Sequence, residues 1–263
     1  MTEPVNTPDS GEETATGQDA AVAGLRTRWS TVRAGIDEAA HRAGRDPARI
    51  RLLPVSKTVP VERLRYAVAA GMTEFAENKP QEIQKKAPAL AGAPELPAVR
   101  WVAIGHLQTN KARIIAEYAS EFQALDSVRL VETLQRRLEL LADAGKDRTL
   151  DVMVQVNTSG EESKTGAAPE EVDAILGATA GCDRLRVRGF MTVATHTRET
   201  TEVRRCFAEL RGIRDRARSS GIVDPEPLTE LSMGMSGDYP LAVAEGATCV
   251  RVGTAIFGAR PPA

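Results

Sequence analysis

The sequence contains little of what marks several classes of protein. Only three of its 263 residues are cysteine, and aromatic residues make up 4%. Cys182, Cys206 and Cys249 are far apart and odd in number. They therefore offer neither a disulfide framework nor a metal-ligand spacing. We interpret them as buried thiols in a reducing compartment.

No charge of one sign is in excess, because 34 Lys and Arg face 36 Asp and Glu, for a net charge of −2. This balance argues against nucleic acid or an anionic membrane as a partner. No apolar run is long enough to span a bilayer.

Residues 1–20 contain no Lys or Arg, so they lack the basic region of a secretory signal. We expect them to form a disordered leader, because they bury too little apolar area to offset chain entropy. The protein is predicted to be cytoplasmic.

The rest of the chain, residues 21–263, reads as one domain in which strands and helices alternate. Helical spacing of apolar residues predicts a leading helix over about residues 20–43. Eight strands are predicted after it, over residues 50–55, 73–77, 101–104, 122–125, 150–156, 187–193, 228–233 and 249–257. Helical patterns between the strands imply a parallel sheet with crossover helices.

Eight such units predict an α/β fold, a single (β/α)8 TIM barrel with an extra N-terminal helix. The alternative is an open doubly wound sheet. We prefer the barrel, because eight units fit it and the nucleotide-type glycine fingerprint does not follow the first strand.

Polar residues that fit no packing pattern come directly after the predicted strands, and a barrel brings such positions to one face. Lys57 follows the first strand. A partly desolvated amine loses proton affinity, because burial disfavours its charged form. Neutral amines form Schiff bases with aldehydes, often with pyridoxal 5′-phosphate (PLP). By its position alone, Lys57 is more simply the start of a solvated loop.

Two motifs near the end of the chain are typical of a phosphate site. Ser236-Gly237-Asp238 opens a predicted helix, and Gly253-Thr254 lies on the adjacent strand. Glycine lets the backbone approach a ligand, and free N–H groups at a helix start favour phosphate. Loops after strands seven and eight are the recurrent phosphate site of TIM barrels. Each motif alone also fits helix capping or packing, but together they favour phosphate.

Three other polar residues have two interpretations each. Arg251 lies inside an apolar strand, where an inward guanidinium needs an acceptor such as a pyridine nitrogen. The alternative is an outward Arg251 that pairs with an acidic helix residue. His106 alone fits a buried imidazole bonded to backbone, and Lys164 alone fits a solvated loop charge.

The chain resembles the pyridoxal-phosphate homeostasis proteins, a family that binds PLP. The two most specific matching segments are Ile104-Gly105-His106-Leu107-Gln108-Thr109-Asn110-Lys111 and Leu231-Ser232-Met233-Gly234-Met235-Ser236. Further matching segments are residues 54–58, 156–158, 163–166, 188–191 and 250–258. The family usually shows Gly-Glu-Asn-Tyr after strand two, where this chain has Ala76-Glu77-Asn78-Lys79. Asn78 is therefore retained and the aromatic residue is not.

The resemblance implies the fold type III barrel of alanine-racemase-type PLP enzymes, without their second domain. It implies that Lys57 holds PLP as a Schiff base, that Arg251 faces the pyridine nitrogen and that Asn78 lies near the ring. Phosphate contacts are assigned to the two late motifs, and Lys164 is expected to assist PLP capture or release. The cofactor-binding set is Lys57, Asn78, His106, Lys164, Met233, Ser236, Arg251, Gly253 and Thr254.

The expected function is to hold, buffer or deliver PLP without turnover, with no catalytic residue and no metal. PLP-dependent apoenzymes are the expected recipients, and the expected state is a monomer. The alternative is a PLP-dependent amino-acid racemase, which needs an acid or base on each face of the cofactor. Lys57 could serve one face. None of the three tyrosines, Tyr66, Tyr118 and Tyr239, lies in a suitable strand-end motif, although Tyr239 is near the phosphate loop.

Overall fold

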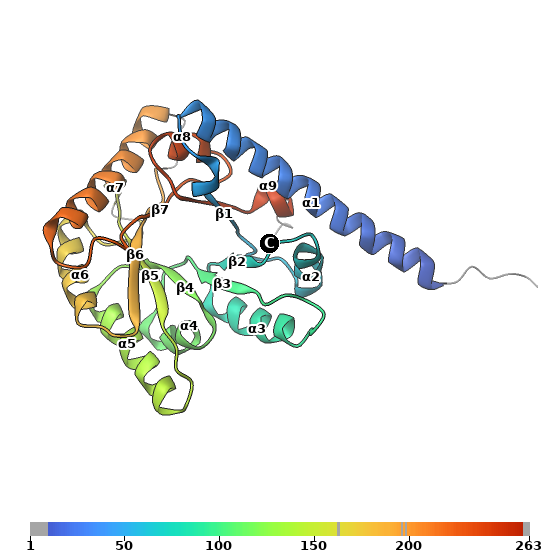
Figure 1. Ribbon diagram of the computed structural model, residues 1–263, viewed down its shortest axis with the longest axis horizontal. Coiled ribbons are helices and arrows are strands. Elements are labelled where there is room, and N and C mark those ends of the chain that lie inside the picture. Colours follow the sequence, from blue (N-terminus) through green and yellow to red (C-terminus); the bar gives the residue numbers. More distant parts are fainter. Residues whose placement is uncertain (1–9, 162–163, 196, 198, 260–263) are drawn as a thin grey trace, which may run out of the picture.

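A computed structural model of the chain describes residues 10–161, 164–195, 197 and 199–259. Figure 1 shows the strands at the centre with helices around them. The strands are β1 (Arg51–Pro54), β2 (Glu74–Glu77), β3 (Arg100–Ala103), β4 (Glu121–Leu125), β5 (Leu150–Gln155), β6 (Leu185–Met191), β7 (Glu230–Ser232) and β8 (Cys249–Val252). The α-helices are α1 (Ser10–Arg42), α2 (Val61–Ala69), α3 (Pro80–Ala91), α4 (Ala112–Tyr118), α5 (Val128–Asp143), α6 (Val172–Ala180), α7 (Thr200–Ser220), α8 (Tyr239–Ala244) and α9 (Thr254–Phe257). Short 3-10 turns cover Pro47–Arg49, Thr109–Lys111 and Pro169–Glu171.

The eight strands form one parallel sheet in the order β1-β8-β7-β6-β5-β4-β3-β2. The two ends of the sheet meet where a parallel bridge joins Val55 to Ala76. There the backbone N–H of Ser56 donates to the Ala76 carbonyl over 2.9 Å. The predicted barrel is therefore confirmed, and the open-sheet alternative is wrong.

Most of the hydrophobic core lies between the strands and the surrounding helices. Helix α5 is an example, because its apolar residues recur at a helical spacing and Leu130, Leu134 and Leu138 are buried. A second, small apolar cluster lies inside the barrel. It consists of Leu53, Val55, Ala76, Val102 and Cys249, with Ile104 packed against it. The barrel interior is otherwise markedly polar.

The last predicted strand is too long. Strand β8 ends at Val252, and Thr254–Phe257 forms the short helix α9. The N–H of Phe257 donates to the Gly253 carbonyl over 2.8 Å, which is a helical bond. A short apolar run such as residues 255–257 has no periodicity that separates strand from helix.

The leading helix begins earlier than predicted. Residues 1–9 of the expected disordered leader lie outside the described residues, whereas residues 10–20 are the first turns of α1. Adding residues to a formed helix needs no new nucleus, so polar residues can extend it without burial. Figure 1 shows that this end of α1 projects beyond the barrel. Farther along, Arg28 Nε donates to the carbonyl of Ile256 over 2.7 Å and so ties α1 to α9.

Two further properties follow from the described part of the chain. None of its helices combines the length and the apolar character needed to cross a bilayer. Cys206 and Cys249 are buried free thiols, as predicted, but Cys182 is only half-buried. Cys182 directly follows Gly181, the residue that caps the C-terminus of α6.

Candidate functional site

A cavity of about 650 Å³ opens at the carboxyl ends of the strands. This is the face on which TIM barrels bind ligands, and the volume is typical of a small-molecule site. Six of the nine residues predicted to bind a cofactor line it, namely Lys57, Asn78, Ser236, Arg251, Gly253 and Thr254. The structure thus brings the lysine after β1 and the two late motifs to one cavity.

The other three predicted residues lie elsewhere. His106 is more than half exposed and belongs to a separate cleft, where its Nδ1 lies 3.1 Å from Asp126 Oδ2. Met233 is fully buried in the hydrophobic core. Lys164 donates to the Ala194 carbonyl over 3.0 Å and pairs with Glu161 at 2.9 Å. None of these three residues lines the cavity.

The strand end that carries Lys57 is fixed by a buried ion pair. Lys86 of α3 and Glu77 of β2 lie 2.7 Å apart, and both are almost completely buried. Lys86 also donates to the Ser56 carbonyl over 3.1 Å, while the Ser56 hydroxyl donates to Glu77 over 2.7 Å. Burial raises the pKa of the Glu77 carboxyl, and the bonds from Lys86 and Ser56 oppose that rise. This cluster therefore holds both the carbonyl and the hydroxyl of Ser56, the residue directly before Lys57.

The loop that carries Asn78 is held by close packing against Gly105. A Cβ on Gly105 would lie 2.1 Å from the Asn78 carbonyl oxygen, well inside any allowed contact. Only glycine therefore lets the loops after β2 and β3 pass each other at this distance. The close contact fixes the Asn78 backbone at the cavity wall.

The two late motifs form one wall of the cavity. Ser236 lies in the turn before α8, where the N–H of Met235 donates to Asp238 Oδ1 over 2.5 Å. Gly253 packs so close to β1 that an added Cβ would lie 3.1 Å from the Val55 carbonyl oxygen. Ser236 and Thr254 are both exposed and line the cavity. Their hydroxyl groups are therefore accessible to a ligand.

Arg251 lies at the inner end of the cavity and is only 4% exposed. Its Nη1 donates to the Ser232 hydroxyl over 2.7 Å, and its Nη2 donates to the Thr192 carbonyl over 2.8 Å. Burial lowers the pKa of Arg251, yet a guanidinium stays charged at any physiological pH. The side chain therefore points into the barrel, and both of its hydrogen-bond partners are neutral.

Several lining residues escaped the sequence-based prediction. Val193 and Met235 are 39% and 40% exposed, and they are two of the three exposed large hydrophobic residues in the described part of the chain. Met235 lies within the segment 231–236 that carries the family resemblance, so the sequence could have identified it as a site residue. Arg63 of α2 also lines the cavity. Nothing in the sequence distinguishes Arg63 from the other charges of its helix.

The chemistry of the wall fits a small anionic ligand with a flat apolar part. Lys57, Arg63 and Arg251 are cationic, and no acidic side chain of the described residues lines the cavity. Val193 and Met235 supply apolar surface. Within the same residues, no group of three or more His, Cys, Asp or Glu is placed to hold a metal ion.

The family model described as alanine racemase, N-terminal domain, matches residues 30–261. A pyridoxal phosphate homeostasis protein of Pseudomonas aeruginosa is 42% identical over 230 residues, which cover 87% of this chain and 93% of that protein. PipY of Synechococcus elongatus, solved with PLP bound, is 33% identical with a TM-score of 0.75, over 89% of this chain and 100% of PipY.

A likeness in fold alone extends to alanine racemase of Clostridium difficile. The two chains are 12% identical with a TM-score of 0.68, over 91% of this chain and 60% of the racemase. The racemase therefore carries the same barrel. On the family match and the relative from Pseudomonas aeruginosa, this chain belongs to the alanine racemase N-terminal domain family and, within it, to the pyridoxal phosphate homeostasis proteins.

Proposed function

We propose that this protein binds PLP through Lys57 and holds, buffers or delivers it without catalytic turnover. One observation carries the proposal: Lys57 lines the same cavity as Ser236 and Thr254, which follow it in the sequence by about 180 and 200 residues. PLP-dependent apoenzymes are the proposed recipients, and a monomer is the proposed state. The structure with PLP bound to PipY supports the ligand, because that protein matches this chain over most of its length.

Each lining residue has a defined task in this proposal. The bound cofactor supplies an aldehyde, which condenses with an amine to an imine and water. Lys57 supplies the amine. Ser236 and Thr254 donate hydrogen bonds to the phosphate oxygens, and Gly253 keeps the wall free of a side chain there. Arg251 donates to the ring nitrogen. Because a guanidinium only donates hydrogen bonds, the ring nitrogen opposite Arg251 must be an unprotonated acceptor, which weakens the ring as an electron sink.

Besides Lys57, the described residues of the cavity wall include no Tyr, His, Cys, Asp or Glu that could serve a racemase as its second acid or base. Lys57 could act on one face, but no tyrosine of the described residues lines the cavity. Tyr239 comes closest in sequence, yet its hydroxyl lies against Gly35 of α1, 2.3 Å from where a Cβ on that glycine would stand. That position is on the outside of the barrel. The relatives' names likewise describe homeostasis, which favours a carrier.

The proposal predicts a visible absorption band when the purified protein is mixed with PLP. Lys57→Ala should abolish the band, whereas the control Lys164→Ala should keep it, because Lys164 is engaged outside the cavity. The loaded wild-type protein should not exchange the α-proton of alanine in D₂O. A band that persists in Lys57→Ala would refute the attachment site, and rapid exchange would establish turnover and restore the racemase.

A further inference from the structure

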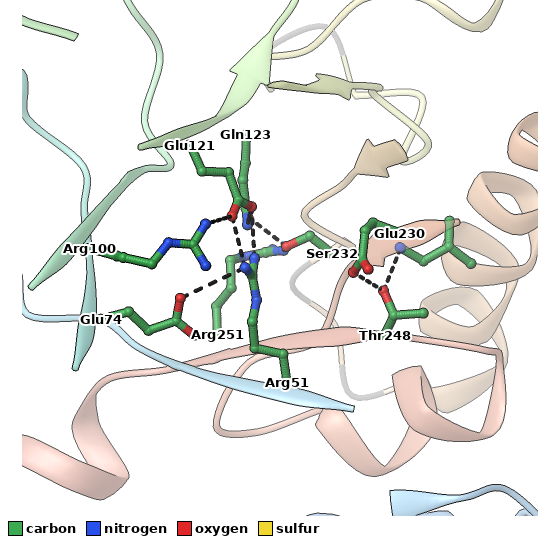
Figure 2. Close-up of polar contacts among 10 residues, drawn as sticks. Arg51, Glu74, Arg100, Glu121, Gln123, Glu230, Ser232, Thr248 and Arg251 are labelled. Carbon is green, nitrogen blue, oxygen red and sulfur yellow. Dashed lines mark hydrogen bonds and ion pairs between the residues drawn. The ribbon is translucent and has the colours of Figure 1, made fainter. Parts of the chain in front are cut away.

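A chain of hydrogen bonds runs through the barrel interior from its floor to Arg251 (Figure 2). At the floor, Arg51 of β1 makes a two-pronged ion pair with Glu121 of β4, at 2.7 and 2.8 Å. Gln123 of β4 donates from Nε2 to Glu121 over 2.6 Å. The Ser232 hydroxyl of β7 donates to Gln123 Oε1 over 2.7 Å, and Arg251 of β8 donates to Ser232.

The direction of each bond in this chain is forced by chemistry. Glu121 is ionised, because the bonds and charge of Arg51 outweigh the effect of burial and hold the pKa of Glu121 below its usual value. An ionised carboxylate only accepts, so the amide nitrogen of Gln123 must face it. The carbonyl oxygen of Gln123 then faces Ser232 and takes its hydroxyl proton. The Ser232 lone pairs are thereby left to accept from Arg251.

These residues have no other evident reason to be polar. Glu121, Gln123 and Ser232 are each at most 2% exposed, and a barrel interior is usually filled by Val, Ile and Leu. Buried polar groups are costly unless every member of the network is satisfied. Of the residues in this hydrogen-bonded network, only Arg251 lines the cavity. The network therefore ends at one functional residue.

We propose that Gln123 and Ser232 are positioning residues for Arg251. They hold its guanidinium at the inner end of the cavity in one orientation, anchored on the Arg51–Glu121 ion pair. A guanidinium carries five N–H donors, and Ser232 and Thr192 occupy two of its three nitrogens, so the remaining donors are aimed rather than free to rotate. The inference rests on the proposed function, in which Arg251 contacts the ring of PLP.

Two variants cut the chain at different places. Ser232→Ala removes the acceptor of Arg251, and Gln123→Met removes the group that orients Ser232 while keeping similar volume. We expect each to weaken PLP binding roughly tenfold, the usual scale of one hydrogen bond to a charged group. We also expect the absorption maximum of the bound cofactor to shift in the same direction as in Arg251→Gln. A general loosening of the barrel would weaken binding without moving the maximum toward that of Arg251→Gln.

Thr248→Val is the matched control. The Thr248 hydroxyl also bonds inside the sheet, donating to Glu230 over 2.6 Å and accepting from the Leu231 N–H over 2.8 Å, but it has no link to Arg251 (Figure 2). PLP affinity and the absorption maximum should stay unchanged in this variant. In an Arg251→Gln background, Ser232→Ala should have no further effect on affinity, because residues acting in series do not add.

Equal effects of Ser232→Ala with and without Arg251 would overturn the inference. So would a crystal structure of ligand-free Ser232→Ala in which the Arg251 guanidinium keeps its place, since that result needs no cofactor. A displaced guanidinium would support it. A wild-type protein that shows no visible band with PLP would instead refute the proposed function, and the ligand-free structure would still decide the role of Ser232.

Discussion

Three cationic side chains of the cavity can contact the same ligand. Lys57 follows β1, Arg63 lies on α2 and Arg251 lies in β8, so the three reach the cavity from different elements. A phosphate monoester carries nearly two negative charges at neutral pH, and cations in a partly buried site attract it strongly. Among the described residues no Asp or Glu lines the cavity itself, although the charge of Asp238 acts on Arg251 from nearby. The site is therefore electrostatically prepared for a phosphorylated ligand.

The phosphate contacts can be tested by comparing two ligands. In Ser236→Ala with Thr254→Ala, PLP should bind roughly 10- to 100-fold more weakly, because each lost bond to a charged group costs about 1.5–3 kcal/mol, partly offset by backbone donors. Pyridoxal has no phosphate, so its affinity should change little. Titration of both ligands by absorbance measures the two losses. Equal losses would show that these hydroxyl groups do not hold the phosphate.

For single residues, some of the side chains predicted from the sequence line the cavity and others do not. The lysine and the two late motifs were found because each follows a strand directly. His106 also follows a strand, but a hydrogen bond to Asp126 turns it into a separate cleft. Met233 lies next to a cavity loop, yet it belongs to the core. Sequence distance from a strand end does not reveal which way a side chain turns.

Strand β4 places two polar residues inward. In β4, Phe122 packs in the core between strands and helices, while Glu121 and Gln123 face the barrel interior. Period-two alternation of polar and apolar residues is visible in this segment of the sequence. A prediction of strands from their apolar residues alone overlooks these polar ones. The usual apolar barrel interior made the inward polar residues unexpected.

The Arg51–Glu121 pair should make the free energy of unfolding fall at acidic pH. The folded-state pKa of Glu121 is lowered: burial raises it, but the hydrogen bonds and charge of Arg51 lower it more. The stability that this carboxylate contributes is therefore present above its unfolded pKa of about 4.3 and is lost as pH falls through the folded pKa. Glu121→Gln should reduce the free energy of unfolding at pH 7 by roughly 1.5–3 kcal/mol, because Arg51 loses its two charged hydrogen bonds and keeps only Glu74, at 3.8 Å.

Urea denaturation at several pH values measures this effect. The difference between wild type and Glu121→Gln should shrink as the pH falls below about 4.3. Glu95→Gln serves as the control, because Glu95 is exposed in a loop and should change stability by less than about 0.5 kcal/mol. A difference that stays constant down to the lowest pH would show that the Glu121 charge is not the source.

At the scale of the whole molecule, the barrel could be predicted because its signal is repetitive. Eight apolar segments separated by helical patterns leave few other arrangements, and the structure confirms that count. The ends of the chain were harder to predict. Helix α1 runs from Ser10 along the outside of the barrel, and α9 replaces the end of a predicted strand. The first difference reflects polar turns added to a formed helix, and the second reflects a short apolar run without periodicity.

The fold also explains how distant segments can act together. The first strand, β1, pairs with the last, β8, in register from Arg51 opposite Cys249 to Pro54 opposite Val252. That pairing puts the loop with Lys57 beside the loop with Thr254, although they are separated by nearly the whole barrel sequence. Closure of the barrel is thus what assembles the cavity.

The most direct test of the central claim is borohydride reduction of the PLP-loaded protein, followed by mass mapping of the modified peptide. Reduction makes an imine between PLP and a lysine permanent, so it identifies the amine that carries the cofactor. We predict one pyridoxyl group, on Lys57. A pyridoxyl group on Lys164 or on any other lysine, with Lys57 unmodified, would contradict the account.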